Sequence, residues 1–143
     1  MEFMDFELER WLPLGGSRCD YNLGGATTPA LSFKDVIDEF DLNWKIGYGY
    51  TKGLDELREG IAKLYSSIDK ENIVVTHGAC EADFLIVNHL LNEGDEMVLL
   101  VPTYLGSYGI AKAIGAKIEL FFLEEEDGYK LNLEKFKEWA VQR

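Results

Sequence analysis

The second half of the chain alternates between short apolar runs and amphipathic runs, and this alternation limits the fold more than any other feature. Three runs predict strands, at residues 72–78 (NIVVTHG), 95–104 (DEMVLLVPTY) and 117–123 (KIELFFL), and each is followed by a segment with helical spacing of its apolar residues. Strands that alternate with helices form parallel sheets with right-handed crossovers. The sequence therefore predicts an α/β fold, a three-layer αβα arrangement around a parallel sheet.

The first half of the chain is less regular. Residues 1–33 join a short amphipathic start to a loop that is dense in turn-forming residues, and they predict an N-terminal arm and loop. Ser32 is suited to cap a short helix, and the apolar spacing over residues 54–65 predicts a longer one. We therefore expect residues 34–143 to be the first part of a larger domain, with the order helix, then β-α-β-α-β-α.

A parallel sheet of three strands would leave a hydrophobic edge strand open to pairing. We expect either that more polypeptide follows in the natural protein, so that the fold is incomplete at the C-terminus, or that an oligomer partner covers this edge.

Charge and composition exclude several classes of function. The 143 residues include 14 basic and 26 acidic side chains, a formal net charge of -12, which repels nucleic acid and anionic membranes. The two cysteines, Cys19 and Cys80, have no metal-ligand companions and indicate neither a disulfide framework nor a zinc site. No apolar stretch approaches the length of a membrane span, and we expect a cytoplasmic protein.

Three stretches could form a ligand site. Small residues at 76–82 (THGACEA) lie where a strand should end and a helix begin, and the free amides of a helix start can bind a phosphate; a plain turn is the alternative. Tyr104 follows the next strand, at the edge of the sheet where ligands bind, or else it is an ordinary core or surface tyrosine. The glycine-rich, aromatic stretch 48–53 (YGYTKG) either reaches into a site or packs on a neighbouring element.

Together, the order and spacing of these stretches resemble the class I/II aminotransferases, fold type I of the pyridoxal 5'-phosphate (PLP) enzymes and part of the aspartate aminotransferase superfamily. The resemblance covers about residues 20 to 143. Its most specific part is GDE followed by an apolar strand and PTY, at residues 94–104.

The resemblance implies roles for several residues. Gly78, Ala79 and Cys80 would hold the cofactor phosphate, and Tyr104 would stack on the pyridine ring of PLP. Tyr50 falls where the family has a tyrosine that reaches the phosphate of the other subunit's cofactor, which implies a homodimer with shared sites.

The substrates implied by the resemblance are an amino acid and a 2-oxo acid, in a biosynthetic process. Gly24 or Gly25 would lie near the substrate carboxylate, although NLGGATTP departs from the family's commoner glycine-acid-proline pattern.

The resemblance also places the family's Schiff-base lysine, its aspartate on the pyridine nitrogen and its carboxylate-binding arginine beyond Arg143. No lysine of this chain matches the motif of the catalytic lysine; those considered are Lys52, Lys70, Lys112 and Lys117. We therefore expect an aminotransferase portion with no catalytic residue, inactive alone. Two alternatives stay open: a short, non-catalytic aminotransferase-like protein that binds a partner or a phosphorylated ligand, and another fold type I enzyme, such as a lyase.

The remaining polar residues predict no further site. We expect His77 to pack beneath the loop at 76–82 and His89 to be partly buried in a helix. Residues 124–127 are contiguous acids in a turn, without the spacing of a calcium loop, and no metal is expected.

Overall fold

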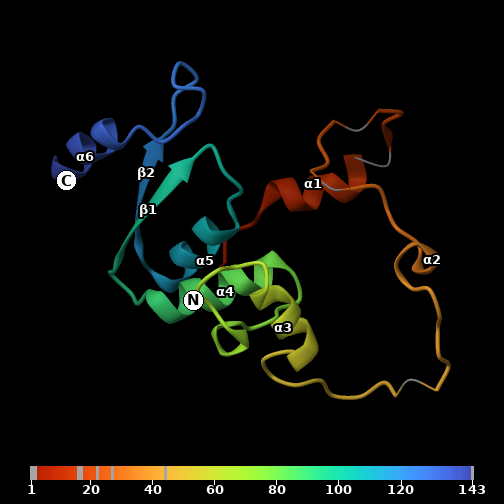
Figure 1. Ribbon diagram of the computed structural model, residues 1–143. Helices are drawn as coiled ribbons and strands as arrows, with labels where there is room; N and C mark the ends of the chain where they lie inside the picture. Colours follow the sequence, from red (N-terminus) through yellow and green to blue (C-terminus); the bar gives the residue numbers. More distant parts are fainter. Residues whose placement is uncertain (1–2, 16–17, 22, 27, 44, 143) are drawn as a thin grey trace. The chain divides into compact units, whose positions relative to one another are not determined.

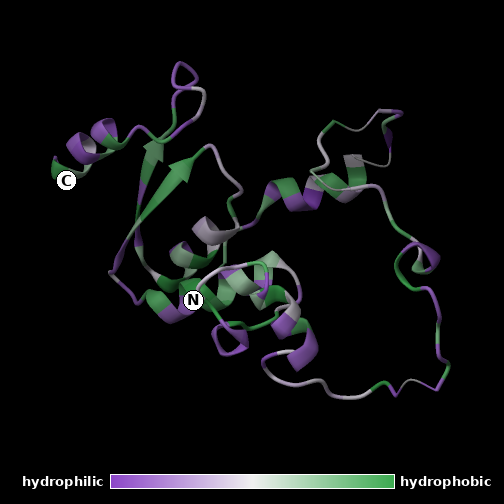
Figure 2. Cartoon of the chain, in the orientation of Figure 1, coloured by the Kyte–Doolittle hydropathy of each residue, from purple (hydrophilic) through white to green (hydrophobic). Residues whose placement is uncertain are grey.

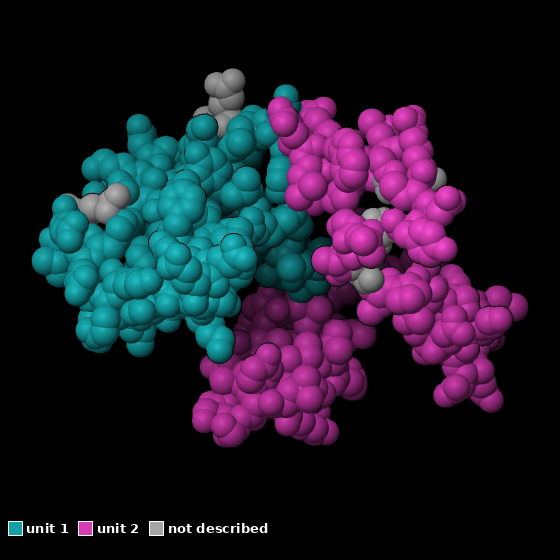
Figure 3. Space-filling model, turned by 90° about the horizontal axis from the view of Figure 1, so that it is seen from above, with its two compact units in different colours: residues 1–6, 76–143 teal, residues 7–75 magenta. Residues whose placement is uncertain are grey.

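The computed structural model describes residues 3–15, 18–21, 23–26, 28–43 and 45–142 of the chain. These residues form two compact units, shown in two colours in Figure 3. Unit 1 comprises residues 1–6 and 76–143, and unit 2 comprises residues 7–75. The N-terminal segment 3–6 thus belongs with the second half of the chain, which the sequence did not predict.

Unit 1 contains a parallel sheet of two strands, β1 (Glu96–Val101) and β2 (Lys117–Phe122) (Figure 1). The register pairs the first residues of the strands with each other, and the Nζ of Lys117 lies 3.5 Å from the Oε1 of Glu96. The apolar runs at 95–104 and 117–123 therefore form strands as predicted.

Three helices accompany the sheet: α4 (Ala79–Leu90), α5 (Gly106–Ile114) and α6 (Leu133–Val141). Helix α5 contacts both α4 and β2. It ends at Gly115, whose φ of 93° is in the left-handed region that glycine adopts readily. The core of unit 1 lies between these elements, and its buried apolar residues are Val87, Val101, Ala111, Ala113 and Phe121.

Helix α6 packs on β2 through aromatic rings. The ring of Phe121 meets those of Phe136 and Trp139 edge to face, at centroid distances of 5.1 and 5.3 Å. Asn132 caps the helix, because its Oδ1 accepts from the backbone N–H groups of Glu134 and Lys135. In Figure 2 apolar colour covers much of both strands, whereas α6 carries polar and apolar colour on different turns and faces.

The predicted strand at residues 72–78 was wrong. Ile73 has extended backbone angles, but within the described residues only β1 and β2 form the sheet. The one backbone hydrogen bond found for Val75 joins its N–H to the carbonyl of Lys52 at 2.9 Å, in unit 2. An apolar run becomes a strand only when a neighbouring strand supplies a ladder of hydrogen bonds, and the run itself does not determine that neighbour.

Unit 2 contains helices α1 (Glu7–Gly15), α2 (Phe33–Val36) and α3 (Asp55–Ala62) and the 3₁₀ turn η2 (Lys70–Asn72). The described residues between α1, α2 and α3 belong mostly to loops, so this part of the chain is irregular, as the sequence predicts. In the portion of the chain that the structure describes, no helix has the length and apolar character needed to cross a membrane.

Arg58 joins α3 to η2 from a buried position, with 5% of its surface exposed. Its Nε donates to the carbonyl oxygens of Lys70 and Ile73 at 3.0 and 3.1 Å, and its Nη1 donates to Asp55 at 2.9 Å. A buried guanidinium must have its donors satisfied, and here backbone carbonyls and acidic side chains satisfy them.

Candidate functional site

The start of α4 has the properties expected of an anion site. Gly78 caps the helix with φ 86° and ψ 172°, and a Cβ built on it would meet no atom within 4 Å. The surface beside Gly78 is therefore open. The first amide N–H groups of a helix have no intrahelical partner and carry the positive end of its dipole, so Gly78, Ala79 and Cys80 offer donors at an exposed helix end.

An acidic side chain is fixed at the same end of α4. The carboxylate of Glu81 accepts a hydrogen bond from the backbone N–H of His77 and lies 3.2 Å from its Nδ1. These bonds, the backbone one most of all, lower the pKa of Glu81, so its negative charge is present over the neutral range. This charge stabilises the helix start and opposes an incoming phosphate.

Neither histidine occupies the position expected from the sequence. The side chain of His77 is fully exposed, at 101%, and it pairs with Glu81 instead of packing beneath the loop. His89 is also exposed on α4. Both expectations of burial were wrong. An imidazole ring is polar and can remain in water, so neither histidine side chain needs to be buried.

Tyr104 follows β1 and lies near the start of α4. Its Oη is 3.9 Å from the Sγ of Cys80, and 44% of its surface is exposed. Its ring rests against the backbone of Gly106, where an added Cβ would come within 2.6 Å of the ring Cε1. The structure therefore brings two of the predicted cofactor residues, Cys80 and Tyr104, together in unit 1.

A third ring contacts Tyr104 from the N-terminal segment. The centroids of Phe6 and Tyr104 are 5.1 Å apart and their planes are tilted by 54°. The sequence did not predict this position of Phe6, because residues 1–33 have the composition of an arm and loop. The only available signal was the apolar character of Phe3, Met4 and Phe6 among acidic residues.

The other predicted site residues lie in unit 2. Tyr50 is 76% exposed in a turn, where its carbonyl accepts from the N–H of Gly53 at 2.9 Å. Gly24 and Gly25 are exposed in the loop after α1. Their roles towards PLP and the substrate carboxylate stay predictions, since they belong to a different unit from Tyr104.

The lysines considered for catalysis have polar or aromatic neighbours of their own. Lys52 pairs with Glu71 at 3.3 Å, and Lys112 lies 5.8 Å from the ring centre of Tyr108. Lys70 donates to Glu59 and Asp55, and these bonds, that to Glu59 first, raise its pKa. A lysine that attacks a carbonyl needs a lowered pKa, so the environment of Lys70 opposes such a role.

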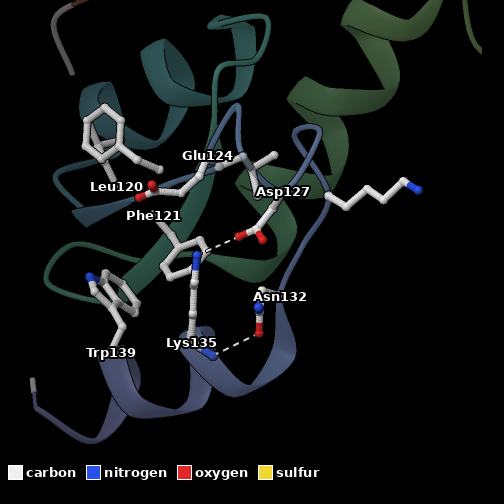
Figure 4. A pocket seen from close by; sticks show the side chains of 10 residues that line it. Leu120, Phe121, Glu124, Asp127, Asn132, Lys135 and Trp139 are labelled. Carbon is white, nitrogen blue, oxygen red and sulfur yellow. Dashed lines mark hydrogen bonds and ion pairs between the residues drawn. The ribbon is translucent and has the colours of Figure 1, made fainter.

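A separate hollow lies between β2 and α6, and Figure 4 shows it at close range. It has a volume of about 350 Å³. Phe121 and Trp139 form its apolar wall, and the ion pair between Lys135 and Asp127, at 2.7 Å, crosses its polar side. The residues of this hollow pack α6 on β2 and form this ion pair. None of the predicted site residues lines it.

No metal centre is evident where the structure describes the chain, since no three histidine, cysteine, aspartate or glutamate side chains gather there. The acidic residues 124–127 lie in turns, and the carbonyls of Glu124 and Glu125 accept backbone hydrogen bonds from residues 127–129.

Known proteins are similar to this chain in both sequence and fold. The model of the family described as aminotransferase class I and II matches residues 31–140. A probable aspartate aminotransferase of Methanocaldococcus jannaschii is 33% identical over 115 residues, which are 77% of this chain and 29% of that protein. The chain thus spans less than a third of that relative's length.

Solved structures give the same result. A PLP-dependent aminotransferase from Streptococcus suis superposes with a TM-score of 0.86 and 28% identity, over 97% of this chain and 40% of that one. An α-aminoadipate aminotransferase from Thermus thermophilus, complexed with N-(5'-phosphopyridoxyl)-L-leucine, superposes with a TM-score of 0.58 and 25% identity, over 68% of this chain and 24% of that one.

These matches define the fold as that of the fold type I PLP-dependent enzymes, and the predicted α/β class is confirmed. The chain belongs to the class I and II aminotransferase family.

Proposed function

We propose that this chain supplies the phosphate-binding and ring-stacking part of a PLP-dependent aminotransferase. The observation that carries the proposal is the approach of Tyr104 to the first turn of α4, with its Oη 3.9 Å from the Sγ of Cys80, in a member of this family. One side of the site then offers helix-end amides and the other offers an aromatic ring. That combination suits a ligand with a phosphate on a flat heterocycle.

The residues at this site fit the cofactor. The amides at the start of α4 would donate to the phosphate oxygens, and the open side of Gly78 leaves room for the phosphate near the backbone. The exposed ring of Tyr104 would cover one face of the pyridine and exclude water from it. When bound, PLP supplies the electron sink for exchange of an amino group between an amino acid and a 2-oxo acid.

Further roles rest on the family resemblance. We assign Tyr50 to the cofactor phosphate of a second subunit in a homodimer, and Gly24 and Gly25 to the surroundings of the substrate carboxylate. The exposure of all three residues is compatible with these roles. We also propose that the protein is cytoplasmic and acts in a biosynthetic process.

Lys52, Lys70, Lys112 and Lys117 do not match the motif of the family's catalytic lysine, and we propose that the chain alone does not catalyse transamination. The test is an assay of the purified chain with PLP, 2-oxoglutarate and a panel of amino acids, in which the new amino acid and the new 2-oxo acid are both quantified. The expected result is the rate of PLP alone. Turnover that depends on the chain and is lost in Tyr104→Ala would contradict the proposed inactivity.

A further inference from the structure

The N-terminal segment packs on α5 inside unit 1. A hollow of about 170 Å³ lies between the segment and the start of α5. It is lined by Phe3, Met4 and Phe6 on one side and by Leu105, Gly109 and Ile110 on the other. A Cβ on Gly109 would stand 3.9 Å from the Cγ of Met4, which is ordinary van der Waals contact. The segment is thus seated on apolar surface next to the site.

Phe6 is the residue of this segment that meets the candidate site. Its ring is half-buried and lies 5.1 Å from that of Tyr104, at a tilt of 54°. The centroid distance is within the range of interacting aromatic pairs, which attract each other beyond the burial of their surface.

Three groups therefore surround the ring of Tyr104 without enclosing it. The backbone of Gly106 lies against the ring, the Sγ of Cys80 lies near its hydroxyl, and the ring of Phe6 lies beside it. An exposed tyrosine that must stack on a ligand otherwise loses rotamer freedom when the ligand binds. A neighbouring ring that already restricts the tyrosine reduces this loss.

We propose that Phe6 is a positioning residue of the cofactor site, which fixes the ring of Tyr104 in the orientation that stacks on the pyridine of PLP. The inference rests on the proposed function, because it assumes that Tyr104 is the stacking residue. It extends that function by making Phe6 a part of the site, although this residue precedes Tyr104 by most of the chain.

The contact itself is tested without the cofactor. The seven tyrosines are replaced by 3-fluorotyrosine, and the ¹⁹F resonance of Tyr104 is assigned with Tyr104→Phe. Removing the neighbouring ring in Phe6→Leu should shift this resonance. Phe3→Leu is the matched control, since it makes the same change on the same segment, and it should leave the resonance in place.

The positioning role is tested by PLP binding. Aromatic pairs of this kind contribute enough to predict a dissociation constant for PLP about two- to tenfold weaker in Phe6→Leu than in Phe3→Leu. Phe6→Tyr retains a ring and should restore the affinity. Far-ultraviolet circular dichroism of each variant shows whether it is folded.

The outcomes separate the inference from the function on which it rests. A Tyr104 resonance that does not move in Phe6→Leu overturns the inference, and so does a moved resonance with unchanged PLP affinity. If the unchanged chain binds no PLP, the proposed function fails, and the resonance alone then decides whether Phe6 fixes the ring.

Discussion

The ring of Tyr104 lies so close to Gly106 that a methyl group on this glycine would come within 2.6 Å of the ring Cε1. Gly106 is the first residue of α5, and no side chain fits there unless the tyrosine moves. The absence of a side chain at Gly106 thus leaves room for the ring of Tyr104, which we assign to stacking on the cofactor.

We predict that Gly106→Ala weakens PLP binding by displacing Tyr104. A lost stacking contact corresponds to about a two- to tenfold weaker dissociation constant. The measurement is a PLP titration followed by absorbance. Gly109→Ala is the control, because its Cβ would meet only the Cγ of Met4 at 3.9 Å and alanine favours the same helix. Equal affinities of the two variants would contradict the role of Gly106.

A second prediction concerns Gly78, where an added methyl would project into the space proposed for the phosphate. Gly78→Ala should weaken PLP binding roughly tenfold, the loss expected for one charge-assisted hydrogen bond. Gly94→Ala is a close control, since Gly94 has a φ of 88° against 86° for Gly78 and both have open space around the added Cβ. Both variants should lose stability in urea unfolding, by about 1–3 kcal/mol for Gly78→Ala, because both glycines have a positive φ that other residues rarely adopt. If both variants lose PLP affinity to the same extent, backbone strain is the cause, and not a methyl group in the space proposed for the phosphate.

The charge of Glu81 should limit the affinity for the phosphate. Glu81→Gln keeps an oxygen that can accept from the N–H of His77 but removes the negative charge at the helix end. We expect PLP to bind about twofold more tightly or better at low salt, with the gain shrinking as salt is added. The measurement is the PLP dissociation constant at two ionic strengths. Weaker binding in Glu81→Gln would mean that the carboxylate supports the site.

The stability of unit 2 should depend on Arg58. Arg58→Met leaves the carbonyl oxygens of Lys70 and Ile73 without their guanidinium donor, at a cost of roughly 1–3 kcal/mol in the free energy of unfolding. Urea unfolding measures this cost. Lys63→Met, an exposed position just after α3, is the control and should change stability by about 0.5 kcal/mol or less. A similar loss in both variants would contradict the assignment.

Local sequence patterns predicted the elements that depend on local chemistry. The apolar runs at 95–104 and 117–123 became β1 and β2, and the helical spacing over residues 54–65 became α3. The helix start at the small residues 78–80 was also predicted, but the strand expected before it is absent from the described residues.

The features that the sequence did not predict depend on contacts between distant segments. The run at 72–78 has three consecutive apolar residues, fewer than the other two runs, and finds no strand partner in the described chain. The approach of Phe6 to Tyr104 joins residues far apart in sequence, and no local period encodes it. His77 is exposed and pairs with Glu81, four residues further along the chain, whereas the sequence predicted that His77 would be buried.

The most direct test of the proposed site compares PLP with pyridoxal, which has the same aldehyde and ring but no phosphate. Pyridoxal closes to an internal hemiacetal, which PLP cannot form, and it therefore reacts less with surface lysines. The effect of inorganic phosphate on the difference is what isolates the phosphate contact. We predict that the chain retains PLP after desalting, with a clearly tighter dissociation constant than for pyridoxal, and that inorganic phosphate reduces the difference. Equal retention of the two compounds would contradict a phosphate site at Gly78, Ala79 and Cys80.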